Sequence, residues 1–261
     1  VVGNNEITAR RIVLATGSRA KIPNVKGLDK VNYLTNESLF DLRKSPRHLA
    51  IIGGGPIGVE MAQAHARLGI KTTIIEINRI MQCYERRFVE PVHKSLIDDG
   101  VNILEGTGVD RVENDRSNIK LHLSSASTLV VSDLLIAAGR ATNIEKLAWT
   151  EADIKYNEFG VIVDRNLQTT NRSVYAIGDI VDGPSFTHTA SYHAAIVLKK
   201  TLFGLSSTIQ TTHIPQVTYT DPEVASVGLN FNDAVKRFGN KVERSSVNLK
   251  SNDRAITDSK T

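Results

Sequence analysis

The sequence predicts an α/β protein with a doubly wound parallel sheet and an antiparallel meander. Three observations carry this prediction. Strand-like and helix-like segments alternate over residues 49–104. The motif Gly53-x-Gly55-x-x-Gly58 directly follows a strand and opens a helix. Apolar patches over 119–131 alternate like neighbouring antiparallel strands. A βαβαβ unit, a meander and a closing strand together indicate one nucleotide-binding domain.

The elements of this domain can be placed in chain order. Parallel strands are expected at 49–52, 71–76, 101–104 and 134–137, and helices at 56–68 and 85–98. Gly69 would end the first helix. Its apolar face is predicted to consist of Ile57, Met61, Ala64 and Leu68.

The flanking segments lack this regular alternation of strands and helices. Residues 12–17 form a short apolar run that ends in glycine, and 36–44 predict a short helix with Asn36 as its N-cap. Further on, strands are expected at 161–163 and 174–177. A helix over 190–203 is expected to bury four residues of its apolar side, Ala194, Ala195, Leu198 and Leu202.

Composition excludes several functional classes. The 261 residues carry a net charge of only +4 without a basic stripe, which argues against nucleic-acid binding. No apolar run reaches the roughly 18–20 residues that span a bilayer, so no membrane partner is expected. The single cysteine, Cys83, excludes an intrachain disulfide and a thiolate metal cage, and fits a reducing compartment. No metal site is expected, and six histidines are interpreted as structural or surface residues: His48, His65, His93, His122, His193 and His213.

The glycine motif has a specific chemical interpretation. One glycine makes the tight turn, one lets the backbone approach a pyrophosphate, and Gly58 lets the helix pack closely on the strand. The helix N-terminus then binds the phosphates. Glu76 ends the next strand, where a carboxylate accepts hydrogen bonds from an adenosine ribose and repels a 2′-phosphate, which favours NAD over NADP. The predicted loop comprises Gly53, Gly54, Gly55, Pro56, Ile57 and Gly58.

Two shorter motifs flank this domain. Ala15-Thr16-Gly17 and Tyr175-Ala176-Ile177-Gly178-Asp179 each follow an apolar strand. Glycine at a strand end lets the backbone come close to a ligand. Asp179 would accept hydrogen bonds from a polyol such as a flavin ribitol.

These motifs, taken in order, resemble the pyridine nucleotide–disulfide oxidoreductase family of flavoproteins. ITARRIVLATGS is similar to the segment where the family's chain leaves its FAD domain, and LAIIGGGPIGVEMAQAHARLG to its NAD fingerprint. LLIAAGRATN resembles the end of the NAD domain, SVYAIGDIVDGPSFTHTA the flavin-contact segment, and IPQVTYTDPEVASVG the opening of the dimerisation domain.

The resemblance implies Rossmann-like three-layer FAD/NAD(P)-binding domains with the start of an α+β dimerisation domain. Residues 1–46 would end the first FAD-domain segment, 47–143 form the NAD domain, 144–211 form the second FAD-domain segment, and 212–261 begin a truncated dimerisation domain.

It also implies roles for single residues. Val112, Gly139 and Arg140 would line the rest of the NAD site. Thr16, Gly17, Gly178, Asp179, Thr187 and His188 would contact FAD.

The resemblance implies a functional role for Glu60 beside a structural one. An acid near a helix N-terminus is favoured by the helix dipole alone. In the family this acid lies near the nicotinamide and pairs with a lysine beside the redox disulfide, which makes Glu60 a candidate catalytic residue.

The chain also departs from the family pattern. Its first GxGxxG, its CxxxxC redox pair and its C-terminal His–Glu dyad are absent, so the resemblance implies the central and later part of a longer enzyme. That enzyme would be a cytoplasmic homodimer that passes hydride between NAD(H) and a flavin/redox-disulfide centre, with a small-molecule or disulfide substrate. Dihydrolipoamide dehydrogenase-like and mercuric reductase-like members stay open. So do a nucleotide-binding fragment without redox activity and a flavin NADH oxidase of the same fold.

Overall fold

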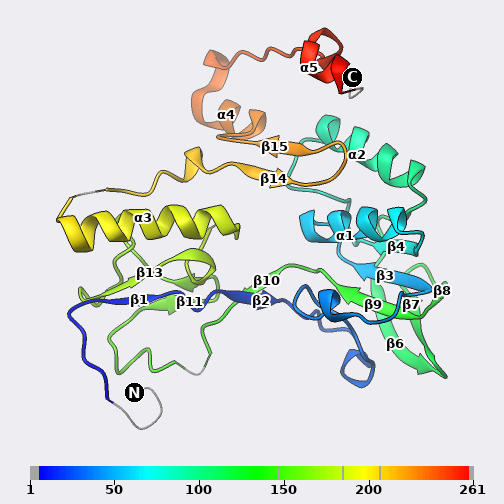
Figure 1. Cartoon of the computed structure of the whole chain (residues 1–261), viewed down its shortest axis with the longest axis horizontal. Helices are drawn as coiled ribbons and strands as arrows, with labels where there is room; N and C mark the ends of the chain where they lie inside the picture. Colours follow the sequence, from blue (N-terminus) through cyan, green and yellow to red (C-terminus); the bar gives the residue numbers. More distant parts are fainter. Residues whose placement is uncertain (1–5, 146, 184, 206, 259–261) are drawn as a thin grey trace. The chain divides into compact units, whose positions relative to one another are not determined.

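The computed structural model describes residues 6–145, 147–183, 185–205 and 207–258. Within it the chain forms two compact units, each built from two separate segments (Figure 1). The first unit consists of Val1–Ile22 and Gly139–Gln216, and the second of Pro23–Ala138 and Val217–Thr261. These divisions differ from the domain ends expected at 46 and 143, which stay a prediction.

The second unit contains the predicted parallel sheet, with strand order β5-β4-β3-β9. Its strands are β3 (His48–Ile52), β4 (Lys71–Ile75), β5 (Asn102–Leu104) and β9 (Asp133–Ile136). All three strand pairings are parallel. Both faces of the sheet are covered, which explains why β3 and β9 read as nearly continuous apolar runs.

Helices cover one face of this sheet and a meander covers the other. Helices α1 (Pro56–Arg67) and α2 (Arg86–Asp98) share a core with Leu49 and Ile51. The meander packs on the opposite side, where Ala50 and Leu134 share its core. It consists of β6 (Val109–Asp115), β7 (Asn118–Leu123) and β8 (Thr128–Val131). The predicted three-layer α/β fold is therefore confirmed.

The predicted apolar face of α1 is wrong by about one position. The helix buries Gly58, Val59 and Ala62, whereas Ala64 is exposed and Leu68 is 76% exposed. The small residues Gly58 and Ala62 allow the helix to approach the sheet closely, and Val59 and Gln63 are buried beside them.

The helix expected over 36–44 is also wrong. That region forms only the 3-10 turn η2 (Leu39–Asp41), after an earlier one, η1 (Leu28–Lys30). The Thr35 N–H donates to Ser38 Oγ, and the Glu37 N–H donates to Thr35 Oγ1. Such local side-chain hydrogen bonds compete with helix formation.

The first unit joins distant segments through short strands. Strand β1 (Ile12–Leu14) pairs in parallel with β13 (Val174–Ala176), and β2 (Ser18–Ala20) pairs antiparallel with β10 (Arg140–Thr142). The expected strand at 161–163 is shorter, because β12 (Gly160–Val161) pairs with β11 (Tyr156–Asn157) as a small hairpin. The turns η3 (Gly178–Ile180) and η4 (Thr211–His213) complete the unit together with one long helix.

That helix, α3 (Thr187–Phe203), does not bury the expected side chains. Leu198 and Leu202 are 52% and 69% exposed. The buried residues are Thr189, His193, Ile196 and Val197. Their spacing is helical, but two of the four are polar, so a reading of hydrophobicity alone selects the wrong face.

The last segment packs in the second unit. Strands β14 (Gln216–Thr218) and β15 (Val224–Ser226) pair with each other. They are followed by α4 (Phe231–Phe238), η5 (Gly239–Lys241), η6 (Leu249–Ser251) and α5 (Asp253–Thr257). None of the helices in the described residues has the length and apolar content that crossing a bilayer requires.

Candidate functional site

The glycine loop of the second unit has no room for side chains at two of its positions. Gly53 has φ +112°, and a Cβ there would lie 2.3 Å from the Ala137 carbonyl oxygen. A Cβ on Gly58 would lie 2.0 Å from the Gly53 oxygen. These glycines bring the loop, β9 and helix α1 into close contact.

Gly55 is different, because a Cβ there would meet open space. It is the N-cap of α1, no side chain caps the helix, and Pro56 occupies the first turn. The backbone N–H groups of that turn have no side-chain cap, and such a helix N-terminus can form a cradle for a phosphate. This geometry fits the pyrophosphate of a dinucleotide.

Glu76 connects the next strand with this loop. Its Oε2 accepts a 2.7 Å hydrogen bond from the Gly54 N–H, and its Oε1 accepts one of 2.9 Å from the Asn78 N–H. The two bonds fix the carboxylate beside the glycine loop, and each oxygen keeps acceptor capacity. A ribose diol is the group that such a carboxylate can bind.

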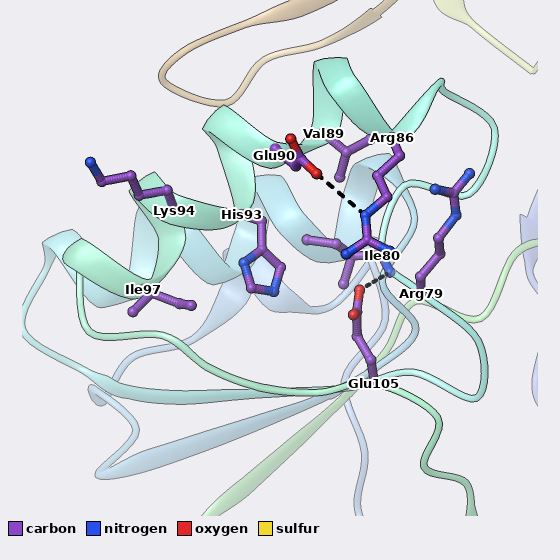
Figure 2. A pocket seen from close by; sticks show the side chains of 9 residues that line it. All are labelled: Arg79, Ile80, Arg86, Val89, Glu90, His93, Lys94, Ile97 and Glu105. Carbon is purple, nitrogen blue, oxygen red and sulfur yellow. Dashed lines mark hydrogen bonds and ion pairs between the residues drawn. The ribbon is translucent and has the colours of Figure 1, made fainter.

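A recess of about 270 Å³ lies between α2 and the segment that follows Glu76 (Figure 2). Within it Glu105 accepts a hydrogen bond from the Ile80 N–H, and Arg86 pairs with Glu90 across one helical turn. Charges of both signs line this recess, so its chemistry selects no single ligand class.

Glu60 lies one turn into α1, where its carboxylate meets the C-terminal segment. Its Oε1 accepts a 2.8 Å hydrogen bond from the Tyr219 N–H. Burial raises the pKa of the Glu60 carboxyl above its ordinary value, and the Tyr219 N–H offsets part of that rise. The position is that of a half-buried acid that can exchange a proton closer to neutral pH than a surface glutamate.

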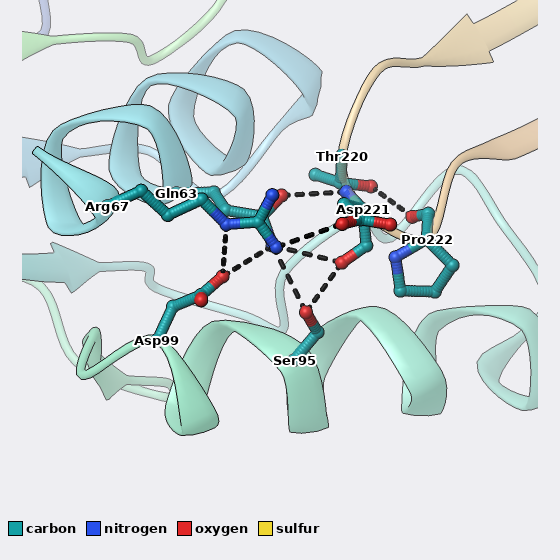
Figure 3. A network of polar contacts seen from close by, with 7 residues as sticks. All are labelled: Gln63, Arg67, Ser95, Asp99, Thr220, Asp221 and Pro222. Atoms are coloured by element: carbon teal, nitrogen blue, oxygen red, sulfur yellow. Dashed lines mark hydrogen bonds and ion pairs between the residues drawn. The ribbon is translucent and has the colours of Figure 1, made fainter. Parts of the chain in front are cut away.

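One turn further along α1, a polar network holds the same segment (Figure 3). Gln63 accepts from the Asp221 N–H at 2.7 Å and donates to the Asp221 carbonyl at 3.0 Å. The Ser95 hydroxyl also donates to that carbonyl, and Arg67 forms ion pairs with Asp99 and with the Asp221 carboxylate. No sequence pattern predicts these contacts between α1, α2 and Asp221.

In the first unit, Asp179 forms a polar cluster with Ser18 and Arg140. The Ser18 hydroxyl donates to Asp179 Oδ2 at 2.5 Å, and Arg140 Nε lies 3.2 Å from the same oxygen. Arg140 Nε also donates to Ser18 Oγ at 2.6 Å. Arg140 thus lies with the residues assigned to flavin, and its assignment to the NAD site stays a prediction.

Gly178, next to Asp179, contacts helix α3. Its N–H donates to His193 Nδ1 at 3.2 Å. Its φ of +69° favours glycine, and a Cβ there would lie 3.1 Å from Ala190 Cβ. Sequence reasoning missed His193, because a lone histidine on a helix shows no ligand spacing.

The remaining predicted FAD residues lie at strand and helix ends of the same unit. Thr16 and Asn143 exchange side-chain-to-carbonyl hydrogen bonds, and Gly17 (φ +68°) follows β1. Thr187 is the first residue of α3. His188 stacks on Phe186 and contacts the Pro215 carbonyl oxygen at 2.7 Å.

Two of the predicted NAD residues, Val112 and Gly139, lie outside the glycine loop. Val112 is buried in the core under the meander, and its N–H donates to the Lys26 carbonyl. Gly139 (φ +107°) belongs to the first unit, where its carbonyl accepts from the Lys21 N–H. The predicted NAD residues therefore divide between the two units.

Comparison with known proteins points to one family. The family model described as pyridine nucleotide-disulphide oxidoreductase matches residues 1–194, and the model of that family's dimerisation domain matches 214–261. A mercuric reductase from Bacillus cereus is 34% identical over 265 residues, which cover 100% of this chain and 42% of that protein. A dihydrolipoyl dehydrogenase from Geobacillus stearothermophilus is 31% identical over 95% of this chain and 53% of that protein.

Solved structures of similar proteins share the fold of this chain. The HOCl-induced flavoprotein disulfide reductase RclA from Escherichia coli superposes with a TM-score of 0.88 at 28% identity, over 98% of this chain and 60% of that one. LpdA from Mycobacterium tuberculosis has a TM-score of 0.85 at 22% identity, over 95% of this chain and 55% of that one, and shares the fold. The chain spans about half the length of the curated relatives it matches.

Proposed function

Because this chain belongs to the pyridine nucleotide-disulphide oxidoreductase family, we propose that it serves an FAD-dependent oxidoreductase that passes hydride between NAD(H) and a flavin/redox-disulfide centre. The cofactors supply the hydride chemistry when bound, and the chain supplies position and electrostatics. The glycine loop and Glu76 of the second unit would bind NAD, and the Gly178–Asp179 turn of the first unit would bind FAD.

The observation that carries this proposal is the bond between Glu76 and the glycine loop. The Gly54 N–H donates to Glu76 at 2.7 Å. This bond joins the carboxylate expected to bind the ribose to the loop expected to bind the phosphates. A negative charge fixed there favours the diol of NAD and repels the 2′-phosphate of NADP.

Polar side chains of the first unit support the proposal that it binds FAD. Asp179 is a partly buried carboxylate at the carboxyl end of β13, with Ser18 and Arg140 against it. The Thr189 hydroxyl is buried without a hydrogen-bond partner among the described residues. Buried polar groups are normally satisfied, so an orphan hydroxyl on α3 is consistent with a bound polar ligand.

Glu60 is proposed as the acid on the nicotinamide side. Burial raises the pKa of its carboxyl, so its Oε atoms hold a proton at higher pH than those of a surface glutamate. The disulfide chemistry would use residues outside these 261, because Cys83 is the only cysteine among them. We expect a cytoplasmic homodimer that acts on a small-molecule or disulfide substrate, in the manner of a dihydrolipoamide dehydrogenase or a mercuric reductase.

The single cysteine also favours one alternative. On its own, this chain would bind nucleotides without transferring electrons to a disulfide. A flavin NADH oxidase of the same fold is a further alternative, and substrate assays of the full-length protein distinguish the three.

The test compares NADH and NADPH binding by fluorescence titration in the unmutated chain, in Glu76→Ala and in the control Glu90→Ala, an exposed acid on α2. We expect clear preference for NADH in the unmutated chain and the control, and loss of that preference in Glu76→Ala. Equal affinity for both nucleotides in the unmutated chain would contradict the assignment of NAD.

A further inference from the structure

His193 occupies an unusual position on α3. Its side chain is only 5% exposed, in a helix whose other buried residues are Thr189, Ile196 and Val197. Thr189 and His193 are four residues apart, so they share one face of the helix. This polar pair lies on the side of α3 that packs against η3, the turn that carries Gly178 and Asp179.

The hydrogen bond to Gly178 determines the chemical state of this histidine. A backbone N–H can only donate, and it approaches His193 Nδ1 at 3.2 Å. Nδ1 must therefore carry a lone pair, so the imidazole is neutral with its proton on Nε2. Burial lowers the pKa of His193 below its ordinary value, which keeps the ring in this accepting form at neutral pH.

The turn at Gly178 depends on α3 at two points. Its left-handed backbone lies against Ala190, where a Cβ would come within 3.1 Å, and its N–H is bound by His193. Asp179 follows directly and directs its carboxylate to Ser18 and Arg140. The orientation of that carboxylate is thus fixed from α3 on one side and from β2 and β10 on the other.

We infer that His193 is a positioning residue for FAD, which as a neutral hydrogen-bond acceptor holds the Gly178–Asp179 turn in the conformation that binds the flavin nucleotide. The inference rests on the proposed function of the first unit. It adds a residue that contacts no cofactor itself and acts through the backbone of Gly178.

Protonation reverses this role. An imidazolium carries a proton on Nδ1, which would then face the Gly178 N–H, so two donors oppose each other. The turn must move away from α3, and the Asp179 carboxylate moves with it. Flavin binding should therefore weaken as the pH falls through the pKa of His193, below about 6.5.

Other groups near this turn also titrate or carry charge. Asp179 on η3 and Arg140 on β10 form an ion pair, Asp182 follows the turn at the surface, and the ring of Tyr192 lies beside His193 on α3. The variants must therefore separate His193 from these neighbours. Asparagine keeps an acceptor oxygen near the Nδ1 position and does not titrate, whereas alanine removes the acceptor.

The first measurement needs no flavin. Ring-¹⁵N histidine labelling of the full chain reports the tautomer and titration of His193, and the Gly178 amide is followed in the same samples. We expect the Nε2–H tautomer at neutral pH and a Gly178 amide shift that follows the His193 titration. An Nδ1–H tautomer, or a Gly178 amide that does not respond, overturns the inference.

The second measurement is the FAD affinity of the full-length protein between pH 5 and 8. At neutral pH we expect His193→Ala to bind FAD about tenfold more weakly, the size of one net hydrogen bond. His193→Asn should retain affinity within about twofold and lose the acid dependence, and the exposed control His213→Asn should behave like the unmutated chain. Unchanged affinity in His193→Ala contradicts the inference, whereas absence of FAD binding in the unmutated full-length protein contradicts the proposed function.

Discussion

Gln63 and Asp221 form a closed pair of hydrogen bonds between a helix side chain and the backbone of a distant segment. The amide oxygen of Gln63 accepts from the Asp221 N–H at 2.7 Å, and its nitrogen donates to the Asp221 carbonyl at 3.0 Å. Gln63 is 4% exposed, so its amide is shielded from water and depends on such bonds. The segment that opens the dimerisation domain is thereby attached to the helix that carries the glycine loop.

Removing this amide should release the segment. Because Gln63→Leu takes the acceptor of a partly buried hydrogen bond from the Asp221 N–H, we expect it to lower the free energy of unfolding by about 1–2 kcal/mol. Hydrogen exchange at residues 217–226 should rise, and denaturant unfolding measures the stability. The control is Gln82→Leu, an exposed glutamine, and equal exchange in both variants would refute the role of Gln63.

Two glycines of the loop should respond differently to alanine. A Cβ at Gly58 meets the Gly53 oxygen at 2.0 Å, so Gly58→Ala should destabilise the second unit by about 1–3 kcal/mol. A Cβ at Gly55 meets no protein atom, so Gly55→Ala should fold normally. It should bind NADH at least about tenfold more weakly, because the methyl group enters the phosphate cradle. Thermal unfolding and NADH titration check both variants, and a stable Gly55→Ala with unchanged affinity would exclude this phosphate site.

Glu60 should make stability depend on pH. Its pKa in the folded chain is raised, mainly by burial, so its contribution is fully present below the unfolded value of about 4.3 and is lost as the pH rises through the folded pKa. Glu60→Gln keeps an oxygen for the Tyr219 N–H and removes the charge. We therefore expect its stability relative to the unmutated chain to increase as the pH rises through that window. Urea unfolding at several pH values measures the difference, and a constant or opposite trend would disprove it.

Much of the second unit could be predicted from the sequence because its signals are local. The strands of the parallel sheet read as apolar runs, and the glycine loop lies between a strand and a helix. Glu76 could be placed because it ends the next strand. The predicted face of α1 failed because close packing there is made by Gly58 and Ala62, which carry little hydrophobic signal.

The contacts that position the sites could not be predicted in the same way. Glu60 with Tyr219 and Gln63 with Asp221 join residues far apart in the chain, and one of each pair contributes only its backbone. His193 is followed by two alanines and an apolar pair, and a polar residue there interrupts the hydrophobic periodicity. Its partner is an amide of Gly178, which no side-chain pattern reveals.

The division of each unit into two segments has a consequence for biosynthesis. Strand β1 leaves the ribosome before its partner β13, which is made only after the whole of the parallel-sheet segment. At about 5–20 residues per second, the apolar residues of Ile12–Leu14 wait roughly 10 to 30 s for Val174 to emerge. During that interval β1 lacks this partner, so we expect chaperones to bind the nascent chain at Ile12–Leu14.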